Sequence, residues 1–353
     1  MPECKQIYQA PEQIGQTMLK QLCAAPLLVF TVNTYASDVT AIPEQSGWNG
    51  FLMGGLGSTQ FSSNFVSGTQ MNSLSSADTD SLYGSPQKES TFAVQYNFDV
   101  RYTFADSGTQ LVLGNLMQDA LRLDFSQQLG IRQQVKNKGI VSVSYLFSGI
   151  ASEVWVDPYQ TDTQRSSTEK SSNGVRLGWE QIWATPLTLT YTRREQTLAE
   201  ESSGGSLGLT TDEQQSLDRN GTINSLESAY RWRLQKNQQL TGALIWENYD
   251  LQGEAMSRTR IGGQLTHSLS TQNYTIVSNL YAGALRYDEN NPVYDTKTDA
   301  AEIAVNVSLF RHNLFGVESL SGLATALWGR SNSQEDFFDS TMSRISAGIV
   351  YKF

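Results

Sequence analysis

Apolar and polar side chains alternate without exception from Phe92 to Phe104. Every even position holds a large apolar or aromatic residue, and every odd position holds a small, polar or charged one. A period of two predicts a β-strand with two unlike faces. The run is longer than the usual strand of about five or six residues. It fits a tilted strand that crosses a bilayer, which needs about ten residues.

The same alternation recurs along the chain and predicts fourteen strands. We expect them near residues 47–58, 91–104, 108–116, 120–135, 139–150, 173–183, 186–198, 221–234, 239–249, 257–269, 273–287, 299–310, 317–330 and 341–353. The pattern is weakest over 108–116, and without the tight hairpin at 117–119 the count falls to twelve. In the strands at 273–287 and 317–330, both parities carry apolar residues, so their facing stays open.

The connections between these strands alternate in length. Short turns follow at 105–108, 136–138 and 235–239, whereas long polar connections lie at 59–90, 151–172 and 199–220. Short turns at one end and long loops at the other are typical of outer-membrane barrels. The sequence therefore predicts an all-β fold, a transmembrane antiparallel up-and-down β-barrel of about fourteen strands, with twelve as the alternative. An even count leaves both termini on the periplasmic side.

The last predicted strand closes the barrel. Its apolar parity carries Ile345, Ala347, Ile349, Tyr351 and Phe353. Inside hydrocarbon, each unpaired backbone group costs several kcal/mol, so the first strand must pair with the last.

The apolar block at 22–32 predicts a secretory signal. It follows Lys20 and precedes the small residue Ala36, which gives the basic, apolar and cleavage regions of such a signal. We expect residues 1–36 to be a signal peptide with an N-terminal extension and Met18 to be the true start. Residues 37–46 would form a short periplasmic segment, and 47–353 the barrel. Cys4 and Cys23 both precede the cleavage point, so no disulfide is expected.

Composition agrees with export and excludes some partners. The formal charge is −10 and the apolar fraction is 39%, below the roughly 45–50% of soluble domains. So acidic a chain is not expected to bind nucleic acid.

The signal, the amphipathic strands and the final Tyr351-Lys352-Phe353 resemble a Gram-negative outer-membrane β-barrel protein of porin-like type. This resemblance implies an outer-membrane location, contact with lipid and lipopolysaccharide, and an assembly signal at Tyr351 and Phe353 that the barrel-assembly machinery reads. The stretch from Ser46 to Phe65 also resembles the start of an uncharacterised bacterial family, domain of unknown function 2860. That family implies no known activity.

Charged residues collect on the parity that faces the lumen. They are Arg101, Arg122, Arg132, Arg176, Arg194, Arg231, Arg233, Arg258, Arg260 and Arg344, interspersed with Asp99, Asp124, Glu180, Glu227, Glu247 and Glu302. Either these charges pair across strands in a water-containing interior, or the arginines line a constriction that selects anions. Aromatic residues on the opposite parity, among them Trp179, Tyr230 and Trp232, predict interface girdles.

No catalytic, metal or cofactor site is predicted. Barrel hydrolases rely on a histidine that activates serine or water. Only His267 and His312 are available, one on the lipid-facing parity and one in a short turn. The acidic residues of the long loops match no calcium-loop spacing. We therefore expect a protein that is not an enzyme.

We predict a passive channel for small hydrophilic solutes, with a non-conducting barrel for structural or surface interaction as the alternative. A transporter of hydrophobic substrates is a third class, but the segment before Trp48 is too short for a plug domain. The sequence leaves open the permeant solute, the ion selectivity, and monomer versus trimer. It also leaves open whether the Thr59–Ser90 loop folds into the pore.

Overall fold

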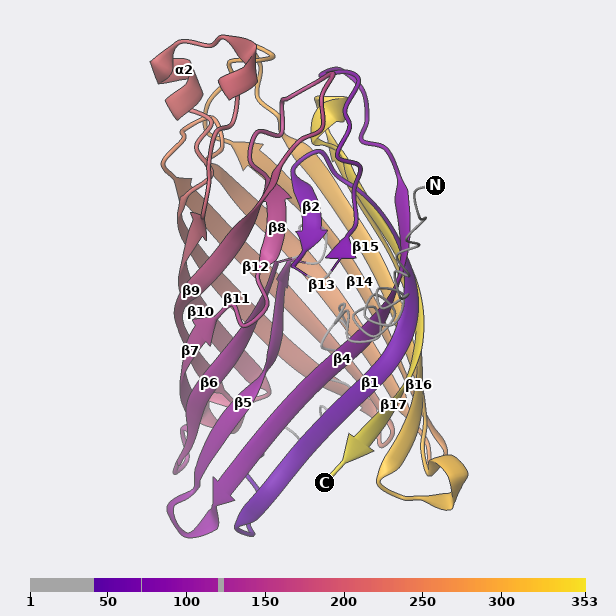
Figure 1. Ribbon diagram of the computed structural model, residues 1–353. Coiled ribbons are helices and arrows are strands. Elements are labelled where there is room, and N and C mark those ends of the chain that lie inside the picture. Colours follow the sequence, from indigo (N-terminus) through magenta and orange to yellow (C-terminus); the bar gives the residue numbers. More distant parts are fainter. Residues whose placement is uncertain (1–40, 71, 120–123) are drawn as a thin grey trace, which may run out of the picture.

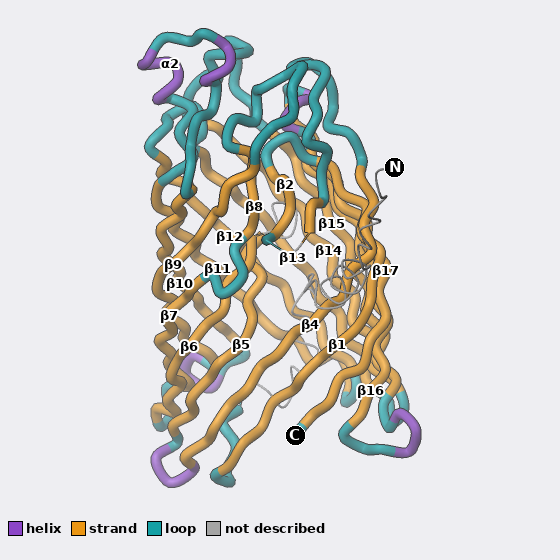
Figure 2. The backbone as a smooth tube through the Cα atoms, in the orientation of Figure 1, coloured by secondary structure: helices purple, strands orange, loops and turns teal. Residues whose placement is uncertain are grey.

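The computed structural model describes residues 41–70, 72–119 and 124–353. Over these residues, fourteen long antiparallel strands close into one barrel, shown in Figures 1 and 2. They are β1 (Gly47–Ser62), β4 (Glu89–Phe104), β5 (Thr109–Asp119), β6 (Asp124–Val135), β7 (Gly139–Phe147), β9 (Ser167–Glu180), β10 (Leu187–Leu198), β11 (Gly221–Gln235), β12 (Gln238–Leu251), β13 (Arg258–Ser270), β14 (Tyr274–Tyr287), β15 (Ala300–Arg311), β16 (Leu320–Ser333) and β17 (Ser340–Lys352).

The barrel closes between β1 and β17, as the sequence predicts. Their register runs from Phe51 opposite Lys352 to Ser62 opposite Thr341. A Cβ on Gly348 would lie 2.6 Å from the carbonyl oxygen of Gly54, so this seam requires a glycine for the close approach of the two backbones.

In residues 41–70, 72–119 and 124–353, helix is confined to short segments. They are α2 (Thr211–Gln215) and the single 3-10 turns Ala105–Ser107, Ile182–Ala184, Gly205–Leu207, Leu314–Gly316 and Asp336–Phe338. In the described part of the chain, no helix is both long and apolar enough to cross a membrane.

The outer face of the wall is a continuous apolar belt. Its exposed side chains include Leu52, Val94, Leu113, Ile131, Val143, Leu177, Leu244, Ile261, Ile303, Val305 and Ile349. At the short-turn end, aromatic rings lie in pairs, such as Trp48 with Tyr102, Trp179 with Trp183, and Tyr230 with Trp232. An apolar belt bordered by aromatic rings matches a bilayer core and its interface. The protein is therefore an outer-membrane barrel.

The predicted strands are confirmed, with local shifts. The hairpin between the third and fourth strands does not turn at 117–119, because β5 continues to Asp119 and β6 begins at Asp124. The alternative of twelve strands is therefore wrong. In β14, Val277 is fully buried in the lumen and Ile276 points outward. In β16, Leu323 is the inward residue and Ala324 the exposed one.

One side of the wall is lower than the rest. The ladder between β4 and β5 runs only from Asp99 opposite Gly114 to Phe104 opposite Thr109, although β4 begins at Glu89. In Figure 1 the two strands diverge above this point. β4 thus continues toward the loop end paired with β1 alone in the described ladders.

Three short strands lie beside this divergence. They are β2 (Val66–Thr69) and β3 (Asn72–Ser73), both in the first loop (residues 63–88), and β8 (Ser152–Trp155). β8 pairs with β9, and β2 pairs with β8. The first loop therefore folds into the barrel, within the outline that Figure 1 shows. The predicted signal peptide and residues 37–40 of the predicted segment 37–46 lie outside the described residues.

Candidate functional site

The lumen differs between its two halves. In the half near the short turns, inward side chains such as Thr190, Glu227, Arg231 and Gln264 are only partly buried. In the half near the long loops, the inward side chains of Glu247, Arg260, Tyr287 and Glu302 are buried, as are the wall residues that the first loop covers. Partial exposure on the inside of a closed wall indicates water-accessible space. The lumen is therefore open toward the periplasm and filled toward the outside.

The first loop packs onto the inner wall through apolar contacts. Val66 and Leu74 from the loop form a buried cluster with Phe61 of β1, Leu327 of β16 and Met342 of β17. This cluster occupies the upper lumen, which explains why the inner face there excludes water.

Several predicted lumen charges form ion pairs. Arg101 binds Asp99 at 2.5 Å, Arg132 binds Glu180 at 2.9 Å and Arg194 binds Asp124 at 2.6 Å. The Nε atom of Arg260 donates to Glu247 at 2.6 Å, and its Nη1 lies 3.7 Å from Glu302. The partners lie on different strands except for Asp99 and Arg101. Compensated charges thus cross the lumen near the short turns as well as near the long loops.

The remaining predicted lumen residues lie at different heights and do not form one ring. Arg344 is buried near the seam, where its Nε donates to Thr59 at 2.9 Å. Arg176, Arg231 and Glu227 are half-buried on the inner wall, and Arg233 is exposed beside the short turns. Arg122 lies outside the described residues. Tyr351 and Phe353 stack in the girdle with ring centroids 6.1 Å apart.

Arg258 differs from the paired arginines. It is 7% exposed, and its guanidinium lies 4.1 Å from the Tyr249 ring centroid and 5.5 Å from that of Tyr287. Its Nη1 donates to the carbonyl of Met256 at 2.9 Å, whereas its Nε–H has no hydrogen-bond partner in the described residues. No carboxylate of the described residues forms an ion pair with it.

A cavity of about 90 Å³ lies against Arg258, beneath the long loops. Its apolar lining includes Phe65, Tyr249, Leu251, Met256, Tyr287 and Phe338. Its charged lining consists of Asp124, Lys170, Arg219 and Arg258. The cavity therefore combines aromatic walls with an excess of cationic groups.

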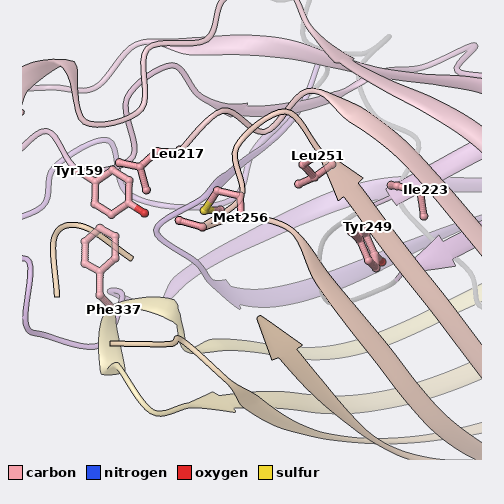
Figure 3. Close-up of a cluster of buried hydrophobic side chains, with 8 residues drawn as sticks. Tyr159, Leu217, Ile223, Tyr249, Leu251, Met256 and Phe337 are labelled. Carbon is pink, nitrogen blue, oxygen red and sulfur yellow. The ribbon is translucent and has the colours of Figure 1, made fainter. Parts of the chain in front are cut away.

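The long loops close over this cavity in an aromatic cap. The cap is the buried cluster of Tyr159, Leu217, Ile223, Tyr249, Leu251, Ala255, Met256 and Phe337, most of which Figure 3 shows. Tyr159 and Phe337 stack with centroids 5.5 Å apart. Burial raises the pKa of Tyr159 and of Tyr294 far above its usual range, so both hydroxyls stay protonated. The side-chain amide of Asn291 donates a hydrogen bond to the Tyr159 hydroxyl oxygen at 3.0 Å.

Arg165 fastens the first loop to the cap. Its guanidinium donates to four backbone carbonyls, those of Asn64, Ser76 and Ala77 in the first loop and that of Pro158. Burial lowers the pKa of Arg165 to about 10, so the group is still charged at neutral pH. From the other side, the Tyr294 hydroxyl donates to the carbonyl of Leu82 at 2.7 Å.

Neither histidine lines the cavity in the described residues. His312, in the turn after β15, contacts Thr275 at 2.8 Å and Ser321 at 3.3 Å. His267 is on β13, opposite Leu240. Within the described residues, no group of three or more potential ligands is placed to hold a metal ion.

Sequence reasoning missed most of the cavity. The cavity is lined from the loop ends of three strands by the inward residues Lys170, Tyr249 and Tyr287. The two tyrosines are aromatic residues at positions where the alternation expects polar ones, and this departure could have indicated the cavity. Arg219 lies in a loop without periodicity, and nothing in its neighbourhood marks it.

Several solved structures of outer-membrane proteins are similar to this chain at low sequence identity. The in-vitro folded form of OmpT, an outer membrane protein of Vibrio cholerae, is similar over 88% of this chain and 99% of its own, with 10% identity and a TM-score of 0.41. The TodX monoaromatic hydrocarbon channel, as its deltaS2 mutant, is similar over 87% and 90%, with 10% identity and a TM-score of 0.46. The outer membrane channel DcaP of Acinetobacter baumannii is similar over 88% and 97%, with 8% identity and a TM-score of 0.39.

None of the curated proteins compared matches the chain. A family model described as protein of unknown function (DUF2860) matches residues 47–352, which include every wall strand. The chain therefore belongs to the DUF2860 family.

Proposed function

We propose that this protein is a passive channel for small hydrophilic solutes, restricted on its extracellular side by the first loop. The division of the lumen carries the proposal: the periplasmic half keeps partly exposed polar side chains, and the extracellular half is filled by a loop rather than by the wall. A barrel of this strand number encloses a water-filled pore when no loop fills it.

Arg165 gives a way to test this restriction. Arg165→Gln removes donors from the carbonyls that hold the first loop, so we expect longer or more frequent openings in planar bilayers. The matched control is Arg193→Gln, since Arg193 is an exposed arginine that contacts Asn224 at 3.2 Å. It should behave as the unaltered protein.

A larger change removes the loop itself. Residues 66–86 can be replaced by a short glycine-serine linker, because Phe61 and Glu89 pair directly across β1 and β4. We expect a severalfold larger single-channel conductance. A folded barrel that carries no current with or without the loop would overturn the channel proposal.

Ion selectivity follows from the same lumen. Arg176 and Arg231 are half-buried on the water-accessible inner wall, together with the acids Glu180 and Glu227. The ten arginines expected on the inner face outnumber the six acids expected there, so we propose a mild preference for anions. The reversal potential in a salt gradient measures it, and cation selectivity would contradict the proposal.

The alternative is a non-conducting barrel whose loops meet a partner at the surface. The aromatic cap favours it, because its eight buried side chains pack together beneath the long loops. Absence of current in the loop-replaced variant, with the barrel folded, would support this alternative.

A further inference from the structure

We propose that the cavity beneath the aromatic cap binds a small monocarboxylate with an apolar or aromatic body. This inference names a solute class for the proposed channel and in that respect rests on the proposed function. The binding itself does not require conduction.

Two buried arginines beside the cavity carry N–H groups that lack a hydrogen-bond acceptor in the described residues. Arg219 and Arg258 are 6% and 7% exposed, and both line the cavity. The Nη1 of Arg219 and the Nε of Arg258 are buried without a hydrogen-bond acceptor in the described residues. A buried N–H of a charged group that lacks an acceptor is costly. A carboxylate supplies two acceptor oxygens in the plane that a guanidinium prefers.

The charge balance of the lining favours an anion. Arg219, Lys170 and Arg258 are cationic, and Asp124 is the carboxylate among the described lining residues. Asp124 already binds Arg194 at 2.6 Å, and Arg219 binds Glu201 at 2.7 Å. Arg258 remains without a carboxylate in the described residues, so a ligand anion would complete its environment.

The lining of the cavity indicates the chemical nature of the rest of the ligand. Phe65, Leu251, Met256 and Phe338 present apolar surface to the cavity, and Tyr249 and Tyr287 flank the Arg258 guanidinium. Such walls favour an apolar body and disfavour a strongly hydrated multivalent ion. The cavity of about 90 Å³ is small, since one water needs roughly 10–15 Å³ on this measure. The ligand is accordingly small.

Calorimetry on the purified full-length barrel in detergent tests the site with benzoate and its neutral analogue benzamide. We expect one benzoate per chain and at least about tenfold weaker binding of benzamide, as a charge-assisted hydrogen bond requires. Equal affinities, or no saturable benzoate binding up to its solubility limit, would overturn the proposal. If sulfate competed as well as benzoate, the inference that the ligand has an apolar body would be wrong.

Variants then locate the site. Arg258→Gln should weaken benzoate at least about tenfold while leaving benzamide unchanged, and Arg193→Gln should bind both as before. Heat-modifiable mobility in gel electrophoresis reports whether each barrel is folded, and the comparison of the two probes on the unaltered protein needs no variant. Unchanged benzoate affinity in a folded Arg258→Gln barrel would contradict the assignment. If the barrel bound benzoate but carried no current, the channel proposal would be wrong and the proposal of a carboxylate site would hold.

Discussion

Asp124 and Arg194 show how single residues stabilise the filled half of the lumen. The side chains are 6% and 1% exposed, and Arg194 also donates to Ser172 at 3.0 Å. Charges this deeply buried are tolerated because each compensates the other. Removing Asp124 takes from Arg194 the carboxylate that it binds.

Asp124→Asn should therefore lower the free energy of unfolding by about 3–5 kcal/mol. Urea titration of the barrel in lipid vesicles measures the change. Glu254→Gln is the control, because Glu254 is exposed in a loop and should change stability by less than about 0.5 kcal/mol. If Asp124→Asn changed the free energy of unfolding by less than about 0.5 kcal/mol, the ion pair with Arg194 would not stabilise the barrel as proposed.

His312 makes stability depend on pH. Burial, together with Lys352 and Arg311, lowers its pKa below the usual 6.5. The unfolded chain then binds the proton more readily than the folded one. The contribution of neutral His312 to the free energy of unfolding is present above pH 6.5. It is lost as the pH falls through the lowered pKa.

We expect His312→Gln to flatten the loss of stability on acidification, measured as urea midpoints over a pH series below 6.5. His267→Gln, on β13, is the matched histidine variant. Identical pH profiles for His312→Gln and the unaltered protein would exclude this effect.

The sequence predicts whether a side chain faces the lumen or the lipid, but it does not predict which charged side chains pair with each other. Period two alone puts Arg194 and Arg260 on the inner face. Their partners depend on register and on height along neighbouring strands: Arg260 reaches Glu247 on β12 and Glu302 on β15. The cavity depends in addition on Arg219, whose position a loop decides.

At the level of elements, the strands follow from the sequence and the loops do not. The alternation from Phe92 to Phe104 places β4 within a few residues of its observed bounds. The first loop has no such period, and its fold depends on contacts far along the chain, such as Arg165 with Asn64. Side-chain donors that bind backbone carbonyls leave no pattern in the sequence.

The whole molecule is held closed at its chain end. Phe353 donates its N–H to the carbonyl of Gly50 at 3.2 Å and accepts from the Gly50 N–H at 2.9 Å. The last residue thus completes the seam between β1 and β17 and adds a ring to the girdle. Both roles agree with the assembly signal that we infer for Tyr351 and Phe353.

Deleting Phe353 should reduce the amount of folded barrel in the outer membrane severalfold, because the final pairing and one girdle ring are lost together. Heat-modifiable mobility of membrane fractions measures it. Phe315→Ala, which removes an exposed ring from a turn at the same end, should insert normally. Normal insertion without Phe353 would contradict the signal, and the molecules that do assemble should keep their conductance.

The low side of the wall has a consequence for the surrounding lipid. On β5 and β6 the outward pair Asn115 and Gln127 is polar and hydrogen bonds at 3.4 Å, while on β4 the outward face stays apolar up to Phe92. The hydrophobic height is therefore unequal around the circumference. A bilayer of uniform thickness meets such a mismatch by thinning locally or by letting the protein tilt. The outer leaflet beside β5 and β6 is accordingly where we expect lipid packing to be most disturbed.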